Sequence, residues 1–74
     1  MNRQEKLVYM ANQIAAFFSA QGEARAVPNV ADHLMKYWDP HMRRSLLVQA
    51  ANSKSGIDPL VRKALPLLKE HASS

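Results

Sequence analysis

Residues 30 to 43 read VADHLMKYWDPHMR, and this stretch holds the only Trp of the chain and two of its three His. Its Asp39-Pro40 pair is typical of a helix start, because an Asp side chain accepts a hydrogen bond from a free N–H of the first turn and Pro fits the first helical position. Leu34 and Trp38 precede the pair at helical spacing. The stretch therefore predicts a joint between two helices.

Before this joint, the spacing of apolar residues predicts two helices. The first covers about 4–21, and Gly22 can end it in a left-handed cap. The second begins somewhere within 23–28 and ends at 37 or 38. Its start is open because Pro28 suits a first turn but kinks a helix that is already established.

After the joint, two further helices are predicted. The first runs over about 40–51, and the polar stretch 52–56 follows it as an exposed loop. The second begins at Pro59 behind the cap Asp58. Pro66 lies inside this last helix and removes a backbone hydrogen bond, so we expect a kink or an end there.

The two Asp-Pro starts belong to a longer echo. Residues 38–43 and 57–62 share the pattern apolar, Asp, Pro, any, apolar, Arg. We interpret both as good helix starts with an apolar residue just outside the cap. A duplicated helical hairpin is excluded, because about 20 residues between echoes are too few for a two-helix repeat.

The first predicted helix carries a wide apolar face. Leu7, Ile14 and Phe18 lie at the centre of an arc that covers about half of the circumference, and Val8 and Phe17 lie at its margins. A single neighbouring helix does not cover so wide a face. The sequence thus predicts more apolar surface than one small core uses.

A chain of 74 residues predicts one all-α domain over 1–74, a small bundle of three to four short helices with its core over about 4–68 and a frayed tail over 69–74. A domain of this size buries only about 60% of the surface that its unfolded chain exposes. The chain has no Cys, so no disulfide stabilises it. Packing, a partner or, for the isolated chain, self-association has to supply the rest.

The composition favours the cytoplasm. No apolar run approaches the roughly 20 residues that a membrane span needs, and the polar segment 2–6 lacks the apolar core of a signal peptide. The formal net charge is +4, but the cations are interspersed, whereas a nucleic-acid binder usually gathers them in a stripe. We therefore expect neither nucleic acid nor membrane as a partner.

No motif for catalysis or for a cofactor stands out. His33 and His41 flank the joint with Asp32 and Asp39 nearby, and these are residue types that bind zinc or iron. Their spacing matches no compact ligand motif. Nucleophile turns, Gly-rich phosphate loops and paired carboxylates in a cleft are also missing. We predict no catalytic, cofactor-binding or metal-binding residue.

The joint is instead typical of a protein–protein contact, because Trp, Tyr and Arg are frequent among residues that dominate binding energy. We predict that Tyr37, His41 and Arg43 contact a partner and that Trp38 supports them from the core. Arg43 falls on the apolar face of its helix. Either its stem packs on Trp38 while the guanidinium reaches water, or it anchors the interface.

Three stretches, in order along the chain, resemble a known family. They are KLVYMANQI over 6–14 followed by Phe17-Phe18, the segment 30–43 with YWDPHMR, and GIDPLVR over 56–62. Together they span roughly residues 5 to 65. In this combination the chain resembles the delta subunit of soluble NAD-dependent formate dehydrogenases.

The resemblance implies an accessory subunit of a cytoplasmic molybdenum or tungsten enzyme that oxidises formate to carbon dioxide with NAD. In such enzymes the alpha subunit holds a bis-molybdopterin guanine dinucleotide and iron–sulfur clusters, and the beta and gamma subunits carry flavin and further clusters. The delta subunit is implied to hold no catalytic residue or cofactor. Its implied role is to assist assembly or stability of the complex by binding the alpha subunit. The absence of Cys agrees with a subunit without a cluster of its own.

A small helix-turn-helix DNA-binding regulator is the alternative. Its recognition helix would be the segment 40–51, which bears Arg43 and Arg44. The same segment carries Leu46, Leu47 and Val48 within two turns of its start. An exposed recognition helix would present these apolar side chains to the DNA groove.

Overall fold

Four α-helices make up most of the computed structural model, which describes residues 2–72 and, of these, the side chains of 2–68. The helices are α1 (Arg3–Ser19), α2 (Glu23–Tyr37), α3 (Pro40–Ala50) and α4 (Pro59–Ala72). The described residues contain no strand. The predicted all-α fold is confirmed.

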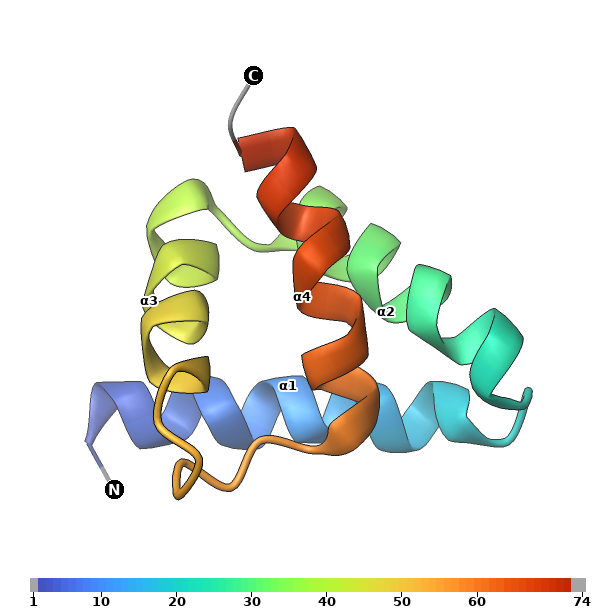
Figure 1. Cartoon of the computed structure of the whole chain (residues 1–74), viewed down its shortest axis with the longest axis horizontal. Coiled ribbons are helices and arrows are strands. Elements are labelled where there is room, and N and C mark those ends of the chain that lie inside the picture. Colours follow the sequence, from blue (N-terminus) through green and yellow to red (C-terminus); the bar gives the residue numbers. More distant parts are fainter. Residues whose placement is uncertain (1, 73–74) are drawn as a thin grey trace.

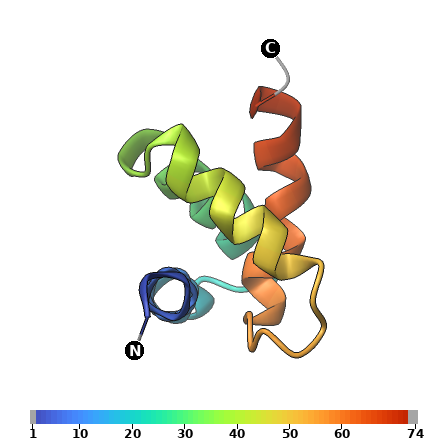
Figure 2. The same ribbon diagram turned by 90° about the vertical axis from the view of Figure 1, so that its left-hand side faces the viewer.

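The helix α1 lies crosswise beneath α3 and α4, and α2 passes behind α4 in the view of Figure 1. Figure 2 shows α1 end-on, with the other helices above it. The most extensive contact between helices is that of α2 with α4, and the next is that of α1 with α2. As a result, α1 has neighbours along one side only.

Both Asp-Pro pairs start helices where they were predicted. At α3, Asp39 Oδ1 accepts the N–H of Met42 at 2.8 Å. At α4, Asp58 Oδ1 accepts the N–H of Leu60 at 2.8 Å. Each carboxylate satisfies a backbone donor that has no partner within its own helix.

Both joints also bind the helix that precedes them, through the Arg of the shared pattern. Arg43 Nη1 donates to the carbonyl oxygens of Leu34, Met35 and Trp38 at the end of α2. The guanidinium of Arg62 does the same at the end of α3, where Nη1 reaches the Ala50 carbonyl at 2.8 Å and Nη2 the Asn52 carbonyl at 3.2 Å. The last carbonyls of a helix lack internal partners, and cations favour that end of its dipole. The repeated pattern therefore caps one helix at its start and the previous one at its end.

The start of α1 was not recognised in the sequence. Asn2 and Glu5 form a capping box: Asn2 Oδ1 accepts the Glu5 N–H at 2.8 Å and the Glu5 carboxylate accepts the Asn2 N–H at 3.4 Å. The box starts α1 at Arg3, one residue before the predicted start. The helix ends at Ser19, two residues before the predicted end. Gly22, with φ +88°, directly precedes α2 instead of ending α1.

Two prolines lie inside helices. Because α2 begins at Glu23, Pro28 comes after its first turn, and the ring is exposed. Pro66 does not end α4, which continues to Ala72. The prediction of an end at this proline is wrong: α4 continues without the backbone hydrogen bond that Pro66 cannot donate, because tertiary packing of its apolar face stabilises the helix. The side chains of the tail expected over 69–74 all lie outside the described ones; its backbone continues α4 to Ala72, and residues 73–74 are not described at all.

One core collects residues from all four helices and from both joints. Its fully buried leucines and valines include Val30 and Leu34 in α2, Leu46 in α3 and Val61 in α4. Burial of each such leucine stabilises the fold by about 1.5 to 3 kcal/mol. The complete cluster is Leu7, Val8, Ala11, Ala15, Val30, Ala31, Leu34, Trp38, Leu46, Ile57, Val61, Ala64, Leu65 and Leu68.

The loop before α4 is held against α1 by one amide side chain. Asn12 Nδ2 donates to the Gly56 carbonyl at 2.9 Å, and Asn12 Oδ1 accepts the Asp58 N–H at 2.8 Å. This pair of bonds joins residues that are more than forty positions apart in the chain. It positions the second Asp-Pro joint on α1.

Candidate partner-binding surface

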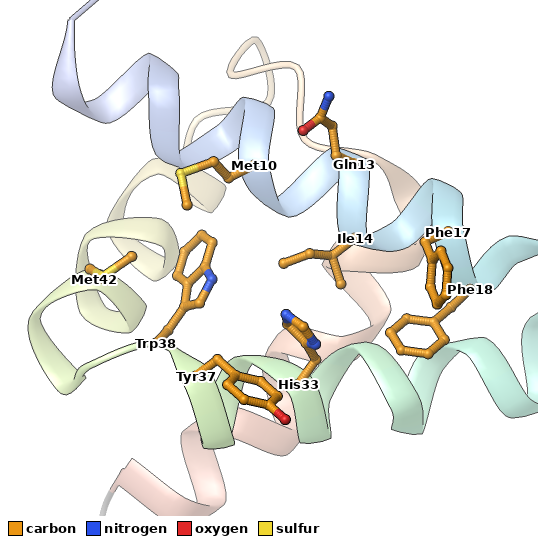
Figure 3. A pocket seen from close by; sticks show the side chains of 9 residues that line it. All are labelled: Met10, Gln13, Ile14, Phe17, Phe18, His33, Tyr37, Trp38 and Met42. Atoms are coloured by element: carbon orange, nitrogen blue, oxygen red, sulfur yellow. The ribbon is translucent and has the colours of Figure 1, made fainter.

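An apolar groove of about 500 Å³ lies between α1, α2 and the start of α3 (Figure 3). Two of its aromatic side chains project into solvent, since Phe17 is 75% exposed and Tyr37 is 72% exposed. Contiguous exposed apolar surface of this kind marks binding sites more often than isolated apolar residues do. The groove is lined by Met10, Gln13, Ile14, Phe17, Phe18, His33, Tyr37, Trp38 and Met42.

The wall formed by α1 follows from helical spacing. Met10 and Phe17 are seven residues apart, so they lie on the same side of α1, two turns from one another. Ile14 lies between them and points toward the centre of the groove (Figure 3). Gln13 borders them, and its Nε2 donates to the Tyr9 hydroxyl at 2.9 Å. In this wall Met10, Gln13 and Phe17 are exposed, while Ile14 is partly buried and packs against the core.

The opposite wall comes from the joint between α2 and α3. His33 and Tyr37 are four residues apart on one face of α2. Trp38 ends that helix, and the turn through Asp39 places Met42 in the first turn of α3. Met10 and Met42 lie beside the Trp38 indole in Figure 3. The joint predicted from the sequence therefore forms one end of the groove.

Ring contacts connect the two walls at the other end. The ring centroids of Phe17 and Phe18 are 5.1 Å apart at an interplanar angle of 80°. Phe18 meets the ring of His33 edge-on at 6.3 Å, and His33 meets that of Tyr37 at 4.7 Å. Edge-to-face pairs of this kind stabilise aromatic clusters beyond the area that they bury. They hold the exposed Phe17 and Tyr37 rings in a continuous row.

Among the described side chains, no Asp, Glu, Lys or Arg lines this groove. The nearest charges on α2 pair with each other, because Lys36 Nζ lies 3.0 Å from Asp32 Oδ2 on the exposed surface. The hydrogen bond to Asp32 and the charge of that carboxylate raise the pKa of the Lys36 ammonium. The described lining of the groove is therefore mainly apolar and aromatic, with Gln13 and His33 as its polar side chains besides the Tyr37 hydroxyl.

A more polar depression of about 230 Å³ adjoins the groove at Met42, which lines both. Its cations are Arg3 and Lys6 from the first turn of α1, and neither forms an ion pair with the described side chains. The carboxylate of Asp39 offsets one of these charges, but it is engaged in capping α3. The depression is lined by Arg3, Lys6, Leu7, Asp39, His41, Met42 and Ser45.

The four residues predicted for the partner-binding site lie in three different environments. Tyr37 lines the groove and is exposed, and Trp38, 5% exposed, supports the groove from the core. His41 is exposed and lies in the adjoining depression. Arg43 is half-buried, with its guanidinium on the carbonyls that end α2. Neither interpretation offered for Arg43 described this use, and partner contact by all four residues stays a prediction.

The sequence analysis did not identify the α1 wall as a binding surface. Its signal was the wide apolar arc, which placed Phe17 at one margin. The buried side of that arc is Leu7, Val8, Ala11 and Ala15, which belong to the core. Periodicity shows that an arc is wide, but the angle at which neighbouring helices pack decides which margin stays uncovered.

The two histidines of the joint do not form a common site, because His33 lines the groove and His41 the depression. Within the described part of the chain, no group of three or more His, Cys, Asp or Glu side chains is arranged to hold a metal ion. Among the described residues, no helix combines the length and the apolar character that a membrane span requires.

The structure lends no support to the DNA-binding alternative. Leu46 of the supposed recognition helix is fully buried, and Arg43 is turned toward α2. A recognition helix has to present one whole face to the major groove. The helix α3 uses that face for the core.

An all-α chain with an exposed apolar groove and a neighbouring cationic depression is typical of a small protein-binding subunit. The chain belongs to the family of NADH-dependent formate dehydrogenase delta subunits, FdsD, whose family model matches residues 6–65. The match spans α1 from Lys6 onward, α2, α3 and the first half of α4, and so includes the whole groove and both joints. The family predicted from the sequence is confirmed. No curated protein and no solved structure matches the chain.

Proposed function

We propose that this chain is a non-catalytic accessory subunit of a cytoplasmic NAD-dependent formate dehydrogenase. In this proposal it binds the large catalytic alpha subunit and assists assembly or stability of the complex. Membership in the delta-subunit family supports its place in such an enzyme. The choice of the alpha subunit rests on the resemblance described above.

The exposure of Phe17 and Tyr37 at the groove carries the proposal. Transfer of a large apolar side chain from water into an interface contributes about 1.5 to 3 kcal/mol. These rings lie beside an otherwise buried Trp38. A small domain gains nothing from holding two such rings in water, whereas a partner that covers them gains the free energy of their burial.

The chemistry of the groove agrees with a binding role. His33 and Tyr37 are its titratable side chains, and their rings pack against each other at 4.7 Å. An acid–base pair instead needs a hydrogen-bonded base that a third group orients. The groove therefore offers contact area and shape, and the reaction is assigned to the other subunits.

Capture of the tagged full-length chain from its native cytoplasm tests this function. We expect it to bring down a large subunit that contains molybdenum or tungsten, together with NAD-dependent formate oxidation. Mass spectrometry of the captured proteins and metal analysis of the same sample provide the readout. Capture that contains no formate dehydrogenase subunit would refute the proposal.

A second experiment separates assembly from stability. In cells without the gene for this chain, an assembly role predicts a large subunit that lacks its metal from the beginning. A stability role predicts a metal-loaded complex that loses activity faster during storage or on dilution. Re-addition of the purified chain rescues the second defect but not the first. An enzyme with unchanged metal content and unchanged lifetime would show that the chain does neither.

A further inference from the structure

We propose that the groove and the adjoining depression together bind one amphipathic α-helix of the partner subunit. Its apolar residues occupy the groove, and carboxylates beyond the apolar segment face Arg3 and Lys6. The inference rests on the proposed function and specifies the chemistry of the partner that this surface recognises.

A stripe along α1 provides the first argument. Arg3, Lys6, Met10, Gln13 and Phe17 recur at spacings of three and four residues, so they follow one face of the helix. All five side chains are exposed. From first to last they extend over about 21 Å, or four turns. This stripe is an unpartnered helix face long enough to pack along a second helix of similar length.

The shape of the site favours a helix as the occupant. The apolar part of the stripe is one wall, and Tyr37, Trp38 and Met42 provide the other. Two walls with a groove between them accept the ridge of side chains on a helix at spacings of three, four and seven residues. The described residues contain no strand to which an extended peptide could add.

The charge pattern specifies the polar end of that helix. Lys36 and Lys63 have acidic partners within the chain, Asp32 at 3.0 Å and Glu23 at 2.7 Å. Arg3 and Lys6 form no such pair with the described side chains. Both lie in the first turn of α1, where the helix dipole disfavours cations. Carboxylates of a partner would offset this unfavourable placement, as Asp39 does in part within the depression.

The same charges argue against a second copy of this chain. In a two-fold dimer through the groove, each copy presents the same surface to the other. The cations of one copy would then meet the cations or the apolar stripe of the other. A partner helix with an apolar face and adjacent carboxylates complements both the groove and the depression.

Binding of full-length variants to formate dehydrogenase purified from cells without this chain tests the proposal. Phe17→Asp is expected to weaken binding about ten-fold or more, because it places a charge in the apolar part. Its matched control is Val48→Asp, since Val48 on α3 is 71% exposed and lines neither the groove nor the depression. The control is expected to bind like the parent.

The charged end is tested separately with the double variant Arg3→Glu/Lys6→Glu. We expect binding to weaken about ten-fold and the salt dependence of the affinity to fall, since salt screens exposed pairs. The control Arg25→Glu/Lys54→Glu makes the same change in net charge at exposed sites outside the surface. Circular dichroism of each variant checks that the helices remain.

A photo-crosslinking amino acid at position 17 identifies the occupant. The proposal expects a crosslink to a helix of the partner that has an apolar face and carboxylates next to it. Reversal of those carboxylates to Lys is expected to restore binding of the Arg3→Glu/Lys6→Glu variant. A crosslink to a second copy of this chain, or to a segment without carboxylates, would overturn the inference.

The two levels of the proposal fail differently. If the parent chain binds no formate dehydrogenase subunit, the proposed function is wrong. If the parent binds and the Phe17→Asp and Arg3→Glu/Lys6→Glu variants bind as well as the parent, the function stands and the amphipathic-helix site is wrong. If Phe17→Asp alone weakens binding, the groove is used but its acidic partner is not, which also overturns the inference.

Discussion

The joints at 38–43 and 57–62 share one six-residue pattern, yet only the first borders an exposed apolar surface. In both, the leading apolar residue is 5% exposed, the Asp caps the helix that follows and the Arg binds the end of the helix before. The second joint is held on α1 by Asn12. The first adjoins the open groove instead. The same local pattern thus produces the same local structure, while its surroundings decide whether it packs on α1 or borders the open groove.

Truncation of the leading apolar residues should give the largest effect. Trp38→Ala is expected to lower the free energy of unfolding by about 3 to 5 kcal/mol, and Ile57→Ala by about 2 to 5 kcal/mol, because each leaves a cavity in the core. Urea titration monitored by circular dichroism measures both. Of these two residues, only Trp38 also lines the groove. Under conditions in which both variants are folded, Trp38→Ala should therefore weaken partner binding and Ile57→Ala should not. Equal binding by both variants would contradict the distinction between the joints.

Removal of each Arg tests the shared internal role. Arg43→Ala and Arg62→Ala are each expected to lower the free energy of unfolding by about 1.5 to 3 kcal/mol, because carbonyl groups at a helix end lose a charged donor. Arg44→Ala is the control, since its side chain is exposed. Thermal unfolding and urea midpoints provide the measurement. If Arg43→Ala leaves stability unchanged and weakens partner binding, the side chain acts at the interface, as the sequence analysis first predicted.

Asn12→Ala should affect only the second joint. Loss of its two hydrogen bonds to the loop is expected to lower the free energy of unfolding by about 1 to 3 kcal/mol. The rate of amide hydrogen exchange should rise for residues 52–58 and stay unchanged for residues 38–43. Uniform acceleration across both joints would mean that Asn12 stabilises the whole fold and not the loop.

The two Asp caps should give the smallest effects and nearly equal ones. Asp39→Ala and Asp58→Ala are each expected to destabilise by about 0.5 to 2 kcal/mol, because a first-turn N–H loses its acceptor. Replacement by Asn, which can also cap, should recover most of the loss. Unequal urea midpoints for the two Ala variants would show that the caps are not equivalent, despite the shared pattern.

The features that could be predicted from the sequence are those that depend on residues close together in the chain. The Asp-Pro starts of α3 and α4 depend on side chains within three residues of the backbone groups that they cap, so their positions could be predicted. The capping box at Asn2 has an equally local basis and was overlooked. The effects of Pro28 and Pro66 were harder to predict, because a proline inside a helix costs free energy but does not end the helix when tertiary packing offsets that cost.

The sequence by itself determined the all-α class, the joints and the family, because periodicity, caps and the order of motifs are properties of neighbouring residues. Only the tertiary structure decided which margin of the wide α1 arc stays open and that Arg43 turns toward α2. Both depend on the angles at which α2, α3 and α4 pack on α1, and those angles arise from contacts between residues far apart in the chain. The α1 wall of the groove is the part of the apolar arc that this packing leaves uncovered.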